Sequence, residues 1–531
     1  MNRNLEQWRV SKAARSSERG VVASQHHLAS RAGAAVLDKG GNAVDAAVAC
    51  AFALNALEPW MCGLGGSGYM VIWHAATARA YFVDFQGMLA KATDSADYPL
   101  DPNIPDSLMG FPGVVENRNV TGYGSIAVPG AVAGLSSAAE RFGKLGLDSI
   151  LEPAITLARR GLPVGWFATL NIALEMGDLL KDPAASDIYL PGGAPAQPEQ
   201  FLRIDKMAET LEALSAEGPD VFYKGRLAEA MARDLQAGGS RITAEDFAAY
   251  REEWREPLVG THRGATLYTA GETSGGLRLN ETLEYVTEHL DTSRPFGAHA
   301  YSVYAKGLNK AFMTHRARVG KIQRAGSTSH MSACDTEGNM VALTYTLLNR
   351  FGAKVVLPST GMVMNNAVSY FDPRPGFPTS MEGGKRINSS NMCPTVAVRD
   401  GRAIFAVGAS GANHIVPCTT QLAGWLLDYD MSLEEVFNLP RIDASGVDRV
   451  RADPAMGEAA LAELAEEFEL EVAQRLVFPK LYSSPSGVLH DPESGLNYGI
   501  SDIGNPSAGA AAAAPLVLED DDSPGDVAVR A

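Results

Sequence analysis

The sequence has few cysteines, and their positions argue against a disulfide framework or a zinc site. Five cysteines occur in 531 residues. No two of them form a CxxC pair, and none stands at the histidine spacing that is typical of zinc ligands. We therefore expect buried free thiols and no metal. The five are Cys50, Cys62, Cys334, Cys393 and Cys418.

Long apolar runs and basic clusters are also missing. No segment is long and apolar enough to span a bilayer, and residues 1–20 are polar, with scattered arginines and no apolar core of signal-peptide length. The net charge is -17 and the pI is near 5.1. Because no basic block of useful length is present, nucleic acid and anionic membranes are not expected as partners. These absences predict a cytoplasmic protein.

The composition is that of a globular chain with a large core, since 46% of the residues are hydrophobic and 20% are charged. The pattern predicts mixed α and β structure. A helix is expected over residues 28–39, and Asn42 can cap a second helix over residues 43–57. That second segment is apolar on every side, which predicts a buried helix. Strands are expected over residues 69–73 and 80–84.

Six residues between these elements, Gly63-Leu64-Gly65-Gly66-Ser67-Gly68, are rich in glycine. They lack the Lys-Ser/Thr ending of a phosphate-binding loop and precede a strand where such a loop precedes a helix. Nucleotide binding is therefore not expected. Residues 148–318 are predicted to be mostly helical, residues 319–327 to be an exposed connector, and residues 506–531 to be a disordered tail.

Two strand-like segments that flank a polar turn, residues 327–335 and 340–347, predict a β-hairpin. If Asp335 and Met340 close the turn, Thr328 lies opposite Leu347 and beside Thr346. A threonine hydroxyl becomes a good nucleophile when its own terminal amine takes the proton, which requires a cut between Ser327 and Thr328. Taken alone, the segment is explained better by an ordinary edge hairpin rich in hydroxyls.

A second hairpin is predicted over residues 396–407, followed by Gly408-Ala409-Ser410-Gly411-Ala412-Asn413. Small residues here allow backbone N–H groups to form a nest for a developing oxyanion. A tight turn between a strand and a helix explains the same residues about equally well. The Pro/Gly-rich loop over residues 372–385 is of the length often found in lids and binding loops.

The hairpin residues resemble the start of the small subunit in the γ-glutamyltransferase (γ-glutamyltranspeptidase) family of N-terminal nucleophile hydrolases. The resemblance rests on Thr328-Ser329-His330-Met331-Ser332, Asp335, Gly338-Asn339, Thr344-Tyr345-Thr346-Leu347 and Phe351-Gly352. Residues 40–47 and 58–66 are similar to the large subunit, and the match recurs across most of residues 20–505. It implies an α+β fold, a four-layer αββα sandwich, in which residues 1–327 and 328–505 form one intertwined domain.

The resemblance also implies roles for particular residues. Thr328 would attack the carbonyl of Ser327 and release two fragments of one precursor, and its freed amine would then serve as the base. Thr346 would hydrogen-bond the nucleophile, while the N–H groups of Gly411 and Ala412 would hold the oxyanion. The substrate would be a small amide or γ-glutamyl compound, and the acyl group would pass to water or an amine. No cofactor is implied.

Substrate recognition departs from the family pattern. The family position of the arginine that binds the substrate carboxylate falls on Gln86. The family position of the acidic residue that binds the substrate ammonium group falls near Ser369-Tyr370. Leu348 stands where the family has asparagine. Ser390 and Asn391 occupy the positions of the paired serines that the family has in a substrate-binding loop. Candidates for the lost positive charge are Arg350, Arg386 and Arg278, each of which is alternatively a solvated surface residue.

The altered recognition residues leave several functions open. One is a γ-glutamyltransferase-like enzyme, and a second is a cephalosporin or glutaryl acylase or a small-amide hydrolase. A third hypothesis involves no catalysis: an unprocessed scaffold or binding protein that retains the fold.

Overall fold

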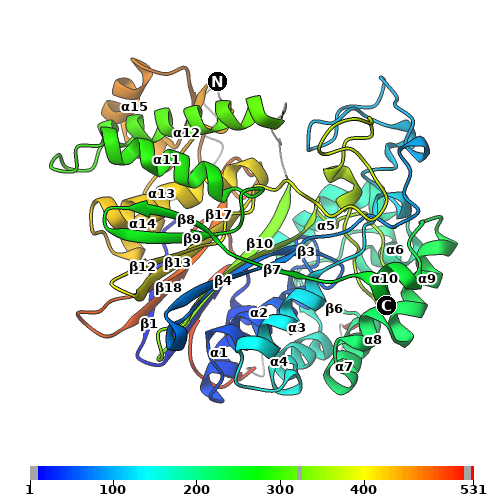
Figure 1. The fold of residues 1–531 in the computed structure, drawn as a ribbon. Helices are drawn as coiled ribbons and strands as arrows, with labels where there is room; N and C mark the ends of the chain where they lie inside the picture. The colour runs from blue at the N-terminus through cyan, green and yellow to red at the C-terminus, as the bar shows by residue number, and fades with distance from the viewer. Residues whose placement is uncertain (1–9, 320–325, 447, 519–527, 531) are drawn as a thin grey trace.

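Two seven-stranded sheets stack face to face, with helices on both outer faces (Figure 1). The computed structural model describes residues 10–319, 326–446, 448–518 and 528–530. Side chains from both sheets, including Tyr69, Val71, Val396 and Phe405, meet in one buried cluster between them. The predicted α+β class and the four-layer αββα arrangement are confirmed.

The first sheet carries the predicted hairpin of residues 327–347 in its middle, and all its pairings are antiparallel. Every residue of the two hairpin strands is buried. The interpretation as an edge hairpin is therefore wrong. In spatial order the strands are β19 (Gly509–Ala512), β2 (Gly20–Ser24), β10 (Ser327–Asp335), β11 (Met340–Leu348), β3 (Ser67–His74), β4 (Arg79–Phe85) and β7 (Glu253–Arg255).

The second sheet is also antiparallel throughout and contains the hairpin predicted over residues 396–407. Its strands are β1 (Arg15–Ser17), β18 (Asn497–Ser501), β17 (Ser484–His490), β13 (Arg402–Ser410), β12 (Thr395–Arg399), β9 (Ala265–Thr269) and β8 (Leu258–His262). Two small sheets contain β14 (Ile442–Asp443), β15 (Val450–Ala452) and β16 (Leu470–Val472), and β20 (Ala528–Arg530), β6 (Phe201–Arg203) and β5 (Leu162–Pro163).

The helix predicted over residues 43–57 is the centre of one outer layer. All 15 residues of α2 (Ala43–Leu57) are buried. Asn42 accepts hydrogen bonds from the N–H groups of Val44 and Asp45 and completes a capping box with Asp45, as a helix start on an apolar run requires. Around α2 lie α1 (His27–Asp38), α3 (Ala131–Phe142) and α4 (Leu147–Arg160), below the first sheet in Figure 1.

The opposite layer covers the second sheet, at the top and left of Figure 1. It consists of α11 (Gly276–His289), α12 (Ala298–Val319), α13 (Ile415–Asp428) and α14 (Leu433–Asn438). α15 (Glu458–Ala465) packs on α12, and α7 (Asp205–Glu217) packs beside α4. The other helices lie at the right of Figure 1: α5 (Trp166–Leu179), α6 (Pro183–Tyr189), α8 (Asp220–Tyr223), α9 (Arg226–Ala237) and α10 (Ala244–Ala249).

The structure adds to one part of the predicted domain organisation and corrects another. Residues 148–318 are mostly helical, as predicted, but they also supply β7 to the first large sheet and β8 and β9 to the second. The alternating burial of β9 fits a strand that is buried on one face. The predicted disordered tail over residues 506–531 contains β19, which pairs with β2 and extends the first sheet. Most of the predicted connector, residues 320–325, lies outside the described residues.

No helix in the described part of the chain is both long and apolar enough to cross a membrane.

Candidate active site

Thr328 lies in a bulge at the start of β10. From Cys334, which pairs with Met340, to Ser329, which pairs with Tyr345, the hairpin register is regular. It then shifts by one residue, so that Ser327 pairs with Leu348. The predicted pairing of Asp335 with Met340 is thus wrong by one residue. A bulge re-aims a side chain locally, which is a common arrangement next to active sites.

The register differs because Asp335 is used in the turn. Its carboxylate accepts hydrogen bonds from the N–H groups of Glu337 and Asn339, at 2.9 and 3.0 Å, and from Ala43 N at 2.8 Å. These bonds tighten the turn and tie it to the start of α2. The hairpin is therefore anchored at its turn, while its open end carries Thr328.

Three hydroxyl and carbonyl groups meet at this open end. Thr328 Oγ1 donates to Thr346 Oγ1 at 3.3 Å. Thr346 Oγ1 in turn donates to the carbonyl oxygen of Ser327 and accepts the N–H of Leu348 at 2.7 Å. Ser327, Thr328 and Thr346 are all buried. The predicted nucleophile, its predicted partner and the carbonyl of the predicted cleavage site are thus in direct contact.

The start of β10 faces the end of β13 from the other sheet. A Cβ added to Gly408 would lie 2.3 Å from the ring of His330, so only glycine fits this approach. The His330 ring lies 2.8 Å from Thr344 Oγ1 and 3.0 Å from Ser332 Oγ. Burial lowers the pKa of His330 to about 3, so the ring is neutral and its role is structural.

The chain leaves β13 through the two residues predicted to hold an oxyanion. Gly411 has φ +130° and Ala412 has φ +53°, so both lie in the region that favours glycine. A Cβ on Gly411 would lie 3.0 Å from Ser483 Oγ. Because Gly408 packs on His330, this turn lies at the same end of the sandwich as Thr328. The predicted turn between a strand and a helix is present here, and the nest for an oxyanion stays a prediction.

Gln86 is connected through a serine to Thr346, the residue that contacts Thr328. Ser67 pairs with Thr346 across the sheet, and Ser67 Oγ donates to Gln86 Oε1 at 3.2 Å. Gln86 is fully buried. Its side chain also lies beside the Tyr69 hydroxyl, which is next to the side chain of Thr273. The family's arginine position is therefore occupied by a neutral amide among neutral hydroxyls.

The loop that contains Ser390 and Asn391 lies next to these hydroxyl groups. Ser390 N donates to Thr273 O at 2.9 Å, and the Ser390 side chain lies beside the Tyr370 hydroxyl. Asn391 follows Ser390 and is also buried. Gln86, Tyr370 and Ser390 thus lie around Tyr69 and Thr273, and Asn391 follows in the same loop. That these four residues bind the substrate stays a prediction.

Arg350 is separate from that group. Its guanidinium is paired with Glu175 at 3.0 Å, and Lys354 shares the same carboxylate at 2.8 Å. Arg350 is therefore held toward α5 as part of a charged cluster.

The other two arginines considered as replacements are also engaged. Arg386 donates to the backbone oxygen of Gln86 at 2.9 Å and pairs with Glu253 at 3.2 Å. Arg278 is buried beneath the binding loop and donates to Ser390 O at 3.2 Å. Burial lowers the pKa of Arg278 to about 10, so it remains a cation at neutral pH.

Glu58 is a buried carboxyl group directly behind the nucleophile strand. It follows the last residue of α2, is 1% exposed, and accepts a hydrogen bond from Ser329 Oγ. Burial raises the pKa of Glu58 to about 8, although the Ser329 hydrogen bond and the charge of Lys480 lower it in part. At neutral pH the group is therefore mostly an uncharged acid.

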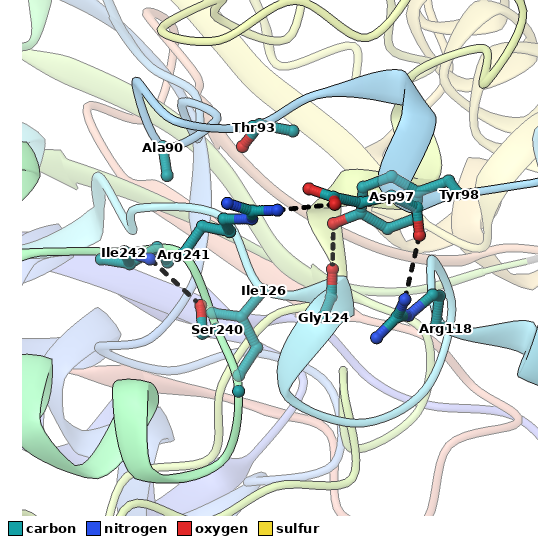
Figure 2. Close-up of a pocket in the computed structure, with 11 residues that line it drawn as sticks. Ala90, Thr93, Asp97, Tyr98, Arg118, Gly124, Ile126, Ser240, Arg241 and Ile242 are labelled. Atoms are coloured by element: carbon teal, nitrogen blue, oxygen red, sulfur yellow. Dashed lines mark hydrogen bonds and ion pairs between the residues drawn. The ribbon is translucent and has the colours of Figure 1, made fainter.

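One cavity of about 250 Å³ lies away from these residues. It is lined by residues of the segments 90–98, 118–126 and 239–242. Figure 2 shows that its charged side chains turn toward one another: Arg241 pairs with Asp97 at 2.6 Å and Arg118 donates to the backbone oxygen of Asp97. It contains none of the predicted catalytic or substrate-binding residues.

Comparison with known proteins identifies the family. The family model described as gamma-glutamyltranspeptidase matches residues 29–306 and 299–512. The chain belongs to the γ-glutamyltranspeptidase family. Among its relatives, the acylase ACY 1 proenzyme of Pseudomonas sp. (strain SE83) is 34% identical over 501 residues, which cover 87% of each chain. The glutathione hydrolase proenzyme of Escherichia coli (strain K12) is 29% identical over 542 residues, 92% of this chain and 90% of the relative.

The crystal structure of cephalosporin acylase from Bacillus halodurans has the same fold. It superimposes with a TM-score of 0.83 over 96% of this chain and 98% of that chain, at 22% sequence identity. This likeness shows the fold alone. Because the chain belongs to the γ-glutamyltranspeptidase family, it is an enzyme of the N-terminal nucleophile hydrolase superfamily, as its sequence predicted.

Several residues of this site were not found from the sequence. Tyr69 and Thr273 carry no local signal, because only the folding of β3 beneath the binding loop brings them together. Ser67 was noticed only as part of a glycine cluster. Glu58 could have been found from the sequence, because it is a charged residue directly after a helix that is apolar on all sides and therefore buried.

Proposed function

We propose that this chain is a precursor that cuts itself between Ser327 and Thr328, and that the mature enzyme uses Thr328 to cleave an amide by way of an acyl enzyme. One observation carries the proposal: Thr346 Oγ1 accepts from Thr328 Oγ1 at 3.3 Å and donates to the Ser327 carbonyl oxygen. This arrangement aligns a nucleophile and polarises the carbonyl that it would attack.

Self-cleavage would proceed by transfer of the Ser327 acyl group from nitrogen to oxygen. Thr328 Oγ1 adds to the Ser327 carbonyl carbon, and the bond to Thr328 N breaks as that nitrogen takes up a proton. Water then hydrolyses the resulting ester, which leaves a carboxylate on Ser327 and a free α-amine on Thr328. The products are two fragments, residues 1–327 and 328–531, that remain associated through the shared first sheet.

In the mature enzyme the α-amine of Thr328 would take the proton from Oγ1 as it attacks the amide carbonyl of a substrate. The N–H groups of Gly411 and Ala412 would stabilise the oxyanion, and Thr346 would hold the nucleophile in place. The leaving amine departs with a proton, and water or a second amine resolves the acyl enzyme.

We propose that the acyl group lacks the α-ammonium of a γ-glutamyl group. The acyl side of the site presents Gln86, Tyr370, Ser390 and Asn391, which are uncharged, so none of the four offers the negative charge with which an ammonium group pairs best. A glutaryl-type acyl group, which keeps the carboxylate but has no ammonium, is therefore favoured, and the naming of the Pseudomonas relative as an acylase fits an acyl group other than γ-glutamyl. A γ-glutamyl acyl group, suggested by the relatives named glutathione hydrolase, is the second candidate.

The test has two parts. The purified protein is run on a denaturing gel and the smaller fragment is sequenced from its N-terminus, where Thr328 is expected. The mature enzyme is then assayed on glutaryl and γ-glutamyl 4-nitroanilides, and the higher kcat/KM is expected for glutaryl. A single intact chain without turnover would favour the scaffold hypothesis. Cleaved protein with a strong γ-glutamyl preference would overturn only the proposed acyl specificity.

We also propose that the protein works in the cytoplasm. All five cysteines are buried and unbridged, as expected where thiols are kept reduced. Fractionation of cells that produce the protein, followed by detection of the fragments, tests this location.

A further inference from the structure

A small cavity lined by both charged and apolar residues lies against the turn that follows β13. It has a volume of about 40 Å³, which is enough for a carboxylate group or one or two waters. Its wall includes Lys480 and Ser483, which contact the turn directly. Lys480 Nζ donates to Ser410 Oγ at 3.2 Å, and Ser483 Oγ is 3.0 Å from the position of a Cβ on Gly411.

Three cationic side chains, Arg441, Arg475 and Lys480, line this cavity. Arg441 is 2% exposed, and its Nε is buried without a hydrogen-bond partner in the described part of the chain. The same holds for Arg475 Nη1 and for Ser483 Oγ. A buried donor without an acceptor is costly, so these groups indicate that something else completes the cavity.

The charges around the cavity do not balance. Arg441 pairs with Asp502 at 3.4 Å, and Arg475 Nε pairs with Asp453 at 2.8 Å. Lys480 bonds only a hydroxyl among the described residues, and Asp502 is the one carboxylate in the cavity wall described here. The charge of Glu58 also acts on Lys480, but burial raises the pKa of Glu58 to about 8, so at neutral pH this carboxyl is mostly protonated. Among the described residues Lys480 therefore lacks a fully charged partner, which a monovalent anion in the cavity would supply.

The cavity and the acyl-side residues lie on opposite sides of the nucleophile hairpin. Ser67 and Gln86 belong to β3 and the end of β4, beyond β11 in the first sheet. The cavity segment leads into β17, which packs over β2 and β10. Gln25, next to β2, also donates to the backbone oxygen of Ser484 at 3.0 Å. In an amide substrate, the acyl chain and the amine likewise lie on opposite sides of the carbonyl carbon.

We infer that Arg441, Arg475, Lys480 and Ser483 form a carboxylate-binding subsite for the amine half of the substrate, the part that leaves during acylation. This inference rests on the proposed function. It assigns the uncharged residues around Gln86 to the acyl group and the cationic cavity to an amine that carries its own carboxylate, such as an amino acid, a peptide or a β-lactam nucleus.

A pair of substrates with one acyl group tests the subsite. Glutaryl 4-nitroanilide is compared with its 3-carboxy derivative in the wild type, in Lys480→Met and in Arg475→Gln. Arg449→Gln is the control, because Arg449 is an exposed arginine paired with Glu469 and does not line the cavity. In the wild type we expect a lower KM for the carboxylated anilide. In Lys480→Met and Arg475→Gln the KM of the carboxylated anilide, relative to the KM of the plain anilide, should rise by about tenfold. That is the effect of losing one charge-assisted hydrogen bond. The control ratio should not change.

Equal KM values for the two anilides, or an unchanged ratio in both cavity variants, would overturn the subsite. The proposed function would still hold, since turnover itself would be present. If no anilide is turned over, the Tm of the protein is measured with acetate and with acetamide. A saturable rise with acetate alone, lost in Lys480→Met, supports the subsite, and no rise in the wild type overturns it.

Discussion

The hydroxyl of Thr328 donates to the hydroxyl of Thr346 across 3.3 Å, from the bulged start of β10 to the end of the neighbouring strand. The lone pairs of Thr346 are occupied by this bond and by the N–H of Leu348, so its own proton is directed to the carbonyl oxygen of Ser327. Leu348 holds φ +80°, an uncommon backbone conformation that aims its N–H at Thr346. Thr346 therefore joins nucleophile and scissile carbonyl.

Replacement of Thr346 by alanine should slow self-cleavage. The loss removes one donor to the carbonyl oxygen, and such a donor accounts for about 10²- to 10³-fold in other acyl transfers. The measurement is the rate at which freshly made precursor disappears on a denaturing gel. Thr346→Ser keeps the hydroxyl and should cleave within about tenfold of the wild-type rate. Equal rates for Thr346→Ala and wild type would contradict this role.

Replacement of Gln86 by arginine should shift specificity toward acyl groups that carry a carboxylate. An arginine here would supply a charged fork for that carboxylate where the wild type offers a neutral amide. We expect the ratio of kcat/KM for glutaryl over pentanoyl 4-nitroanilide, which has no carboxylate, to rise at least about tenfold, or about 1.4 kcal/mol.

Gln86→Met is the matched control, because it keeps the length of the side chain without its polar end and should not raise that ratio. A cleaved, folded Gln86→Arg protein with the wild-type ratio would show that position 86 does not contact the acyl group.

Some of these contacts could be predicted from the sequence and others could not. The contact of Thr328 with Thr346 follows from hairpin pairing, and the burial of α2 follows from its apolar sequence, because both depend on neighbouring residues. The bulge was missed because it depends on how Asp335 binds the turn. The tail strand β19 was missed because an alanine run gains its order only by pairing with β2.

The polar groups around the site needed the full fold. Tyr69 and Thr273 are 204 positions apart in the numbering, and they meet because β3 of the first sheet packs against the second sheet, whose strand β9 ends shortly before Thr273. The cationic cavity likewise combines residues from four separate segments between Phe167 and Asn505. Neither group has a spacing that a sequence pattern could reveal.

The capping box of α2 gives a prediction about stability. Asn42→Ala should lower the free energy of unfolding by about 1 kcal/mol more than Asn42→Ser does, because serine still accepts from the first turn of the helix. Both variants lose the bond from Asn42 Nδ2 to Phe142 O, so their difference isolates the cap. Denaturant unfolding measures it. Equal losses in the two variants would mean that the cap contributes nothing.

Glu58 makes stability depend on pH. Burial raises the pKa of Glu58 from 4.5 to about 8. Between these two values the unfolded chain has released a proton that the folded protein keeps, so the carboxyl group destabilises the fold progressively as pH rises. Below about pH 4.5 the carboxyl is protonated in both states and has no such effect. Each pKa unit corresponds to about 1.4 kcal/mol.

Glu58→Gln should therefore be more stable than the wild type by about 1–3 kcal/mol at pH 8 and much closer to it at pH 5. The amide can still accept from Ser329 and has no charge to bury, so the gain must come from the lost ionisation. The measurement is Tm for both proteins at several pH values from 5 to 8. Glu140→Gln serves as the control, because Glu140 is an exposed glutamate on α3. A Tm difference between Glu58→Gln and wild type that stays constant over this range would mean that Glu58 ionises alike in the folded and unfolded protein.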